Sequence, residues 1–465
     1  MKKNEMRQTT ERIDMLSGSL LNKIFLFAVP LALSSILQQL FNSVDVAVVG
    51  HFANSQAQAA VGCNGPIINL IINLFIGISV GTNVVIANYI GGREKEKIKD
   101  AVHTSMVVAA ISGMILLVLG VVIARPVLIL MDTPEDVLEY AVLYLRIFSL
   151  GMPFIMIYNF GAAILRSVGD TKRPLYCLIL SGLINAGLNL FLVIVFHLDV
   201  AGVAIATVIS NVISASMVWY FLMKENGPIR LSFRKLKISK TELKKTLRIG
   251  MPAGLQGMVF SIANVCIQTA LNGYGSDAVA GSAVALNFEY FTYFVIGAFN
   301  QTAVTFTSQN FGAAQYERCR KVYRCCIASS ILITGGMSLI FLLGKGFFVS
   351  LFTTDPDVTG FAVIRMLYVL SFIPLASTYE IGGASLRGIG YSMTPAVLTV
   401  FGTCLFRLVW IYTVCRIFTD FRILMIVYPI SWLITGASVL AAYYIIRKKV
   451  FSRRDFLRIS EDPQL

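Results

Sequence analysis

The sequence contains one long pattern twice, with the second copy offset by 221 residues. Segment 165–169 reads Leu-Arg-Ser-Val-Gly, and segment 386–390 reads Leu-Arg-Gly-Ile-Gly. Other positions with this offset are Asp136 and Asp357, Pro153 and Pro374, Pro174 and Pro395, and segments 89–92 and 310–313. A repeat of this length predicts two equivalent bundles, provided that each copy is built from apolar helices.

The hydropathy of the chain meets that condition. Of 465 residues, 56% are hydrophobic and 14% are charged, and the mean hydropathy is +0.73. No soluble domain buries that much apolar surface, so lipid must act as the solvent. Long apolar runs favour helices over a β-barrel, because a helix satisfies its own backbone groups in lipid. The predicted spans are 20–48, 60–89, 101–124, 137–163, 175–196, 200–223, 247–271, 279–309, 323–344, 360–384, 393–415 and 423–446. We therefore predict an all-α integral membrane protein with twelve transmembrane helices in two six-helix lobes.

The net charge of +14 comes from basic residues in alternate loops. One side carries the basic residues of the N-terminus, 93–99, 172–173, 224–248, 318–324 and 447–458. The opposite loops contain only Arg125, Lys345, Arg416 and Arg422. Basic loops face the cytoplasm, so we predict a multi-pass protein of the cytoplasmic membrane with both termini inside. This distribution explains the charge without a nucleic-acid partner.

The longest polar connection divides the chain into two lobes. We predict an N-terminal cytoplasmic segment (1–19), a first lobe (20–223), a basic linker (224–246), a second lobe (247–446) and a cytoplasmic tail (447–465). The amphipathic stretch 236–247 is expected to lie along anionic membrane lipids, with a regulatory partner site as the alternative. The sequence contains no phosphate-binding loop, haem motif or zinc constellation. We therefore expect neither an enzyme nor an ATP-driven pump, and no cofactor beyond a coupling ion.

Ionisable residues inside the spans are the main functional candidates, because each costs about 2.5–3.5 kcal/mol at a helix centre. Asp45 has no opposite charge near it in sequence, and we predict a functional role for it. A buried carboxylate can load and release a proton, or it can bind sodium together with neutral oxygens. Asp45 is thus a metal ligand only if sodium is the coupling ion.

Polar residues of three other spans are expected to join Asp45. Asn185 and Asn189 lie one turn apart and share a helix face. Thr207 and Asn159 are candidates to converge on the same point. The alternative for all four is simple hydrogen bonding between helices.

The second lobe carries two candidate acids, Glu289 and Glu380. Glu289 lies within an aromatic run, and the rings of Phe288, Tyr290 and Tyr293 suit a flat organic cation through cation–π contact. The alternative is structural pairing with intramembrane arginines. Candidates for that pairing are Arg146, Arg365 and Arg407, with Arg387 beside Glu380.

Pro30 and Pro252 occupy equivalent places in the first and seventh spans. A proline frees a helix carbonyl and permits a kink, so both are candidate gating elements. Static bends are the alternative reading.

Together these residues resemble the multidrug and toxic compound extrusion (MATE) transporters, of the bacterial MepA/DinF-like type. The matching elements are Pro30, Asp45 and Gly50, segment 165–170, Asn185, segment 202–207, segment 309–313 and segment 386–390. The resemblance spans nearly the whole chain. It implies two six-helix lobes forming a V, which export organic cations in exchange for sodium or protons.

The resemblance also implies a cation site at Asp45, Asn185, Asn189 and Thr207. Members usually carry Asp at the position of Asn189, and this departure favours protons over sodium. Members of the NorM type place a Glu in the seventh span, whereas this chain has no acidic residue between Met251 and Gly275. Glu289 and Glu380 are then the substrate candidates of the second lobe.

The predicted function is therefore a cation-coupled antiporter of small organic cations, working as a monomer by alternating access. One alternative is a lipid-linked oligosaccharide flippase of the same superfamily, which needs several Arg or Lys residues to hold a pyrophosphate. A second alternative is a dedicated metabolite exporter. A receptor or a channel fits less well, because the chain brings no sensor domain and duplicates a bundle that contains buried acids.

Overall fold

The computed structural model describes residues 12–52, 55–131 and 133–461, and these residues form helices and connections without a β-strand. Eleven helices are long and apolar enough to cross a membrane. A twelfth span consists of two helices, Glu135–Leu150 and Met152–Ser167, which meet at a bend of 47°. The predicted all-α membrane fold is confirmed.

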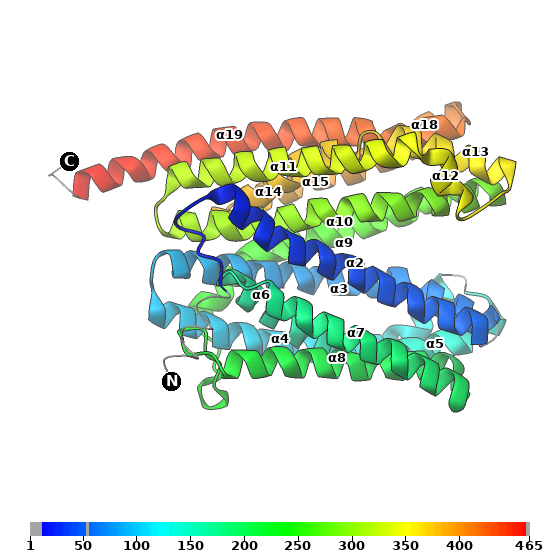
Figure 1. Cartoon of the computed structure of the whole chain (residues 1–465), viewed down its shortest axis with the longest axis horizontal. Coiled ribbons are helices and arrows are strands. Elements are labelled where there is room, and N and C mark those ends of the chain that lie inside the picture. The colour runs from blue at the N-terminus through cyan, green and yellow to red at the C-terminus, as the bar shows by residue number, and fades with distance from the viewer. Residues whose placement is uncertain (1–11, 53–54, 132, 462–465) are drawn as a thin grey trace. The chain divides into compact units, whose positions relative to one another are not determined.

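The helices follow the predicted spans closely, and consecutive spans run in opposite directions (Figure 1). The first half contains α2 (Leu20–Phe52), α3 (Ser55–Gly91), α4 (Lys95–Leu130), α5 (Glu135–Leu150), α6 (Met152–Ser167), α7 (Lys172–Leu190), η1 (Phe191–Val195) and α8 (Asp199–Met223). After η2 (Phe233–Lys235), the second half contains α9 (Lys240–Asn272), α10 (Ser276–Gly312), α11 (Tyr316–Leu343), α12 (Lys345–Ser350), α13 (Pro356–Arg365), η3 (Met366–Leu370), η4 (Ile373–Leu375) and α14 (Ala376–Gly388). It ends with α15 (Met393–Thr399), η5 (Val400–Leu405), α16 (Phe406–Tyr412), α17 (Val414–Ile417), α18 (Phe421–Met425) and α19 (Val427–Glu461).

The 221-residue offset of the sequence recurs in the backbone. Helices that begin at equivalent positions are α3 and α10, α4 and α11, α5 and α13, and α7 and α15. Gly169 and Gly390 have φ angles of 89° and 93°, a conformation that glycine adopts without steric cost. Arg93 and Ala314 both have a φ of 57°. The repeat therefore fixes the turns as well as the helices.

The chain forms two compact units, which differ from the predicted lobes in two places. Unit 1 holds Val29–Met258 and the segment that ends at Asp14, and unit 2 holds Met15–Ala28 and the chain from Val259 onward. Helix α2 thus begins in unit 2 and continues in unit 1, whereas α9 begins in unit 1 and continues in unit 2. A core cluster of unit 1 contains Val49, Leu145 and Val203, all fully or almost fully buried.

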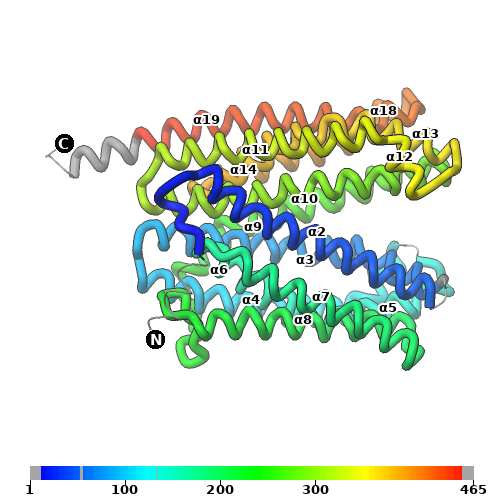
Figure 2. The backbone as a smooth tube through the Cα atoms, in the orientation of Figure 1, coloured from blue at the N-terminus to red at the C-terminus, as the bar shows by residue number. Residues whose placement is uncertain are grey.

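The connection between α8 and α9 is shorter than predicted, because α9 begins at Lys240 rather than at 247 (Figure 2). Glu242 of its first turn is buried and accepts a hydrogen bond of 2.7 Å from the Tyr89 hydroxyl of α3. Before the helix, the backbone N–H of Leu231 donates to the carbonyl of Leu222 at 3.0 Å. From Lys240 onward the stretch 236–247 is the first part of a span, with Glu242 and Thr246 buried, and its contact with membrane lipids stays a prediction.

Within unit 1, α3 and α9 approach each other through glycines. Gly77 and Gly81 of α3 face Gly250 and Gly254 of α9, with both pairs four residues apart. A Cβ on Gly77 would lie 2.1 Å from the backbone nitrogen of Gly254. Such spacing of small residues lets transmembrane helices approach backbone to backbone.

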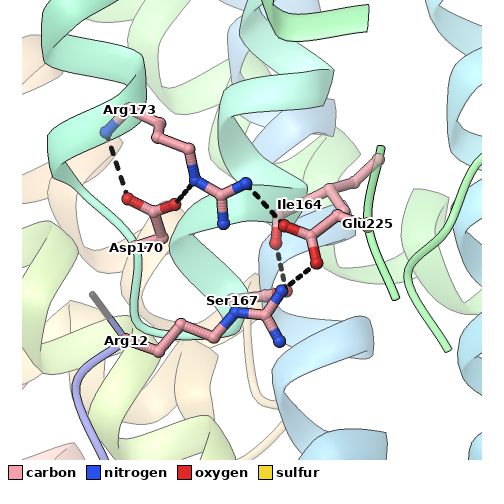
Figure 3. Close-up of polar contacts among 6 residues, drawn as sticks. All are labelled: Arg12, Ile164, Ser167, Asp170, Arg173 and Glu225. Carbon is pink, nitrogen blue, oxygen red and sulfur yellow. Dashed lines mark hydrogen bonds and ion pairs between the residues drawn. The ribbon is translucent and has the colours of Figure 1, made fainter. Parts of the chain in front are cut away.

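A buried ionic cluster ties the loops of unit 1 together (Figure 3). Arg173 at the start of α7 bonds to Asp170 through Nε, and its Nη1 lies 2.5 Å from Glu225 Oε1. Arg12 pairs with the other oxygen of Glu225. Asp170 and Glu225 are 1% and 2% exposed. Burial raises the pKa of the Asp170 carboxyl, and the positive charge of Arg173 opposes that effect.

Replacing Gly77 with alanine is expected to lower the melting temperature of the purified protein by several degrees. The new methyl group must displace backbone of α9, and overpacking costs about 1–3 kcal/mol. Gly62→Ala is the matched control on α3, because a Cβ there meets nothing within 4 Å. Equal melting temperatures for the two variants would contradict the close contact.

Glu225→Gln is expected to lower the free energy of unfolding by about 3 kcal/mol, because it removes a buried anion and leaves the partly buried Arg173 with only one of its two partners. Glu96→Gln serves as control, since the Glu96 side chain is 84% exposed in its pair with Lys99. An exposed pair contributes about 0–1 kcal/mol. Comparable losses in denaturant titrations of the two variants would exclude a stabilising role for the buried cluster.

Candidate functional site

A chain of polar side chains surrounds Asp45 within unit 1. The Asp45 carboxylate is 7% exposed and accepts a hydrogen bond from Asn189 Nδ2 of α7. Asn189 Nδ2 also lies 3.3 Å from Asn185 Oδ1. Asn185 Nδ2 in turn donates to Thr207 Oγ1 of α8 at 3.3 Å. The structure thus brings together four of the residues expected to converge, from three different helices.

The charge of Asp45 has no basic partner within the described part of the chain. Its neighbours are amides and a hydroxyl, and Thr207 Oγ1 donates to the carbonyl of Val203 at 3.0 Å. Asn189 Oδ1 is buried and accepts no hydrogen bond from any described group. An anionic carboxylate without a counter-charge and an amide oxygen without a donor therefore belong to the same network. Such a pair is completed by a proton or by a bound cation.

Asn159 does not join this network. Its Nδ2 donates to the carbonyl of Ile155 at 2.8 Å, one turn earlier on its own helix. A side chain that satisfies its donor locally has less need of a distant partner. The expected contribution of Asn159 to the Asp45 site is not supported.

In unit 2, Glu289 forms a buried ion pair with Arg365. The guanidinium Nε and Nη2 lie 2.7 Å and 3.0 Å from the two carboxylate oxygens. The two residues are 7% and 2% exposed. This geometry corrects the expectation that Glu289 offers a free negative charge. The structure instead shows the alternative, structural pairing, in which Arg365 connects its helix to the helix of Glu289.

Glu380 accepts hydrogen bonds from two neutral side chains, and the charge of Arg387 also acts on it. Its Oε1 accepts a hydrogen bond of 2.8 Å from the Tyr293 hydroxyl, and its Oε2 accepts one of 2.5 Å from Asn300 Nδ2. The backbone carbonyl of Glu380 also accepts from Asn300, at 3.1 Å. Asn300 was not among the predicted residues. Its position seven residues after Tyr293, two turns along the same helix face, was the available signal, but many polar residues share such spacings.

A cavity of about 200 Å³ opens beside the ion pair in unit 2. Glu289, Tyr290 and Tyr293 line it, together with Arg407. Phe288 does not, because its ring packs against Phe341, Phe348 and Phe352, with centroid distances of 5.2–5.8 Å. Successive residues of a helix point about 100° apart, so an aromatic run cannot direct all of its rings to one side.

Arg407, one of the arginines expected to pair within the bundle, is 1% exposed, and its Nε donates to Ser431 Oγ at 3.0 Å. Pro30 and Pro252 lie inside the continuous helices α2 and α9. The carbonyl of Pro30 accepts a hydrogen bond of 2.7 Å from Ser34 Oγ. The gating role of both prolines stays a prediction.

Comparison with known proteins places the fold in one family. The MatE family model matches residues 30–191 and 252–413. The probable multidrug resistance protein YoeA of Bacillus subtilis is 30% identical over 383 residues, covering 81% of this chain and 83% of that protein. The multidrug export protein MepA of Staphylococcus aureus is 23% identical over 369 residues, covering 79% of each.

Solved structures show the same fold. A MOP superfamily transporter from Pyrococcus furiosus superposes with a TM-score of 0.88 at 23% identity, covering 94% of this chain and 98% of that one. The family match accounts for both halves of the 221-residue repeat and for more than half of the sequence. The chain therefore belongs to the MatE family and is a MATE family transporter.

Proposed function

We propose that this transporter exports organic compounds across the cytoplasmic membrane in exchange for protons, by alternating access, with both termini in the cytoplasm. The carrying observation is the buried Asp45 carboxylate, which has only neutral polar neighbours. Intramembrane charges are costly, and one that lacks a counter-charge must be neutralised by something that comes and goes. Several relatives are named as multidrug resistance or export proteins, which supports export of drug-like compounds.

Protons are proposed over sodium because the network supplies few free oxygens. Hard cations generally take about six or more oxygen ligands. Here Asn185 Oδ1 already accepts from Asn189, and Thr207 Oγ1 is engaged with a backbone carbonyl. Only the Asp45 carboxylate and Asn189 Oδ1 remain in this network as oxygen ligands for a cation. A single proton on Asp45 removes the charge and supplies a donor for the neighbouring amide oxygen.

Organic cations remain proposed substrates, since a cation can compete with the proton for Asp45. Glu289 cannot serve as their docking point while both its oxygens bind Arg365. In unit 2, Glu380 is the remaining acidic candidate, because its two oxygens accept from Tyr293 and Asn300 and form no bidentate pair with an arginine. A lipid-linked oligosaccharide flippase fits less well. One of the two buried arginines beside the cavity is already paired, so a pyrophosphate would find a single cation.

Asp45→Asn is expected to abolish efflux of ethidium from proteoliposomes that is driven by a proton gradient, because the amide can neither load nor release a proton. Asp136→Asn, which changes an exposed acid of the same unit, should retain efflux. The same vesicles under a sodium gradient should show little transport. Efflux by the Asp45 variant, or a preference for the sodium gradient, would refute proton coupling at this residue.

Glu289→Gln is expected to destabilise the protein by about 3–5 kcal/mol, because it strands the Arg365 charge. Replacing Glu289 and Arg365 together with methionine should restore much of that stability, along with ethidium efflux. Glu139→Gln, which removes an exposed partner of Arg125, is the control and should change stability little. A Glu289→Gln protein that melts normally but exports no ethidium would reveal a substrate-binding acid instead.

A further inference from the structure

The cavity of unit 2 is lined by buried hydrogen-bond donors that have no acceptor. Arg407 Nη2 and Trp432 Nε1 are both buried, and neither finds a partner among the described residues. Both residues line the cavity, and they are 1% and 4% exposed. A buried donor without an acceptor costs about 1–3 kcal/mol, and more when the group is charged. Two residues that line one cavity thus each carry a donor without an acceptor, which favours a ligand rich in acceptors.

The charges around the cavity also favour a ligand with acceptor groups, because their sum is positive. Glu289 and Arg365 neutralise each other through two hydrogen bonds. Arg407 then adds an uncompensated positive charge. Its Nε donates to Ser431 Oγ at 3.0 Å, and its guanidinium lies 4.5 Å from the ring centroid of Tyr428. A hydroxyl and an aromatic face orient a guanidinium, but neither supplies a negative charge.

Irregular turns position both arginines. Arg365 is the last residue of α13, directly before the π-helical turn η3. Arg407 follows the π-helical turn η5 by two residues. A π-turn shifts the register of the side chains that flank it, and such turns often occur at functional sites.

We propose that this cavity binds the carboxylate of a small aromatic acid, or of a zwitterion that carries one. A planar carboxylate accepts two parallel hydrogen bonds, which matches the guanidinium of Arg407. Its second oxygen is available to the indole N–H of Trp432. Phe260, Tyr290 and Tyr428 line the same cavity and offer an apolar, aromatic surface to a flat ring.

As an assignment of transport substrate, this inference rests on the proposed function. It widens the substrate class from organic cations to compounds that present a carboxylate in unit 2. The binding site itself can be tested without transport.

The test measures binding of three probes to the purified full-length protein by calorimetry and by thermal shift. Benzoate, benzamide and benzylammonium share a ring and differ in charge. We expect benzoate to bind and stabilise the protein, with benzamide at least about tenfold weaker, since a hydrogen bond to a charged group exceeds a neutral one by that factor. Benzylammonium should show no effect at this site.

Substitutions of the cavity residues test whether benzoate binds in this cavity. Arg407→Met, which replaces the buried charge with an apolar chain, should weaken benzoate at least tenfold. Trp432→Phe keeps the ring and removes the N–H, and it should weaken benzoate several-fold. Arg146→Met, at an exposed arginine of unit 1, is the control and should bind benzoate normally. If Arg407→Met does not fold, the affinity of Trp432→Phe for benzoate still tests the site.

The outcomes separate this inference from the proposed function. Asp45→Asn should still bind benzoate, even where it no longer exports ethidium. Binding of benzylammonium as tight as that of benzoate, or unchanged benzoate affinity in the Arg407 and Trp432 variants, would overturn the carboxylate site while leaving proton coupling intact. Binding of inorganic phosphate without benzoate would also overturn it, in favour of a phosphate or lipid headgroup.

Discussion

Compensation of buried charge is the constraint on which this structure depends. Lipid offers no solvation to an ion, so each charge inside the bundle needs a partner, a proton or a ligand. The protein provides partners for Asp170, Glu225 and Glu289, each of which meets a guanidinium. It leaves Asp45 among amides and leaves Arg407 among rings and one hydroxyl. Function is assigned here to Asp45 and Arg407, two buried charges for which the described residues provide no ion pair.

Duplication supplies the scaffold but not the sites. The two halves share turn conformations and helix starts at an offset of 221 residues. Their charged residues do not follow the same rule. The position equivalent to Asp45 is Cys266, and the position equivalent to Arg407 is Ala186. Each unit has therefore acquired its own chemistry, with the Asp45 carboxylate in one and the Arg407 guanidinium in the other.

Sequence reasoning succeeded where a signal was local or rare. Hydropathy and the repeat predicted where the spans lie, although several helices begin or end six or more residues beyond the predicted bounds. Asp45, Asn185 and Asn189 were predicted together because an acid in a span is unusual and an interval of four residues defines a helix face. Contacts between residues far apart in the sequence could not be predicted in this way. Glu289 and Arg365 are 76 residues apart, and no residue pattern near either of them indicates that they pair. Asn159 donates to a carbonyl of its own helix. The sequence around Asn159 does not show whether its side chain bonds locally or reaches Asp45.

The most direct test of the account is the number of protons that leave the protein when a cation binds. The purified transporter in weakly buffered detergent, titrated with ethidium beside a pH indicator, should release protons in the wild type and none in Asp45→Asn. Equal release by the two proteins, or ethidium binding without any release, would show that Asp45 does not exchange a proton for substrate.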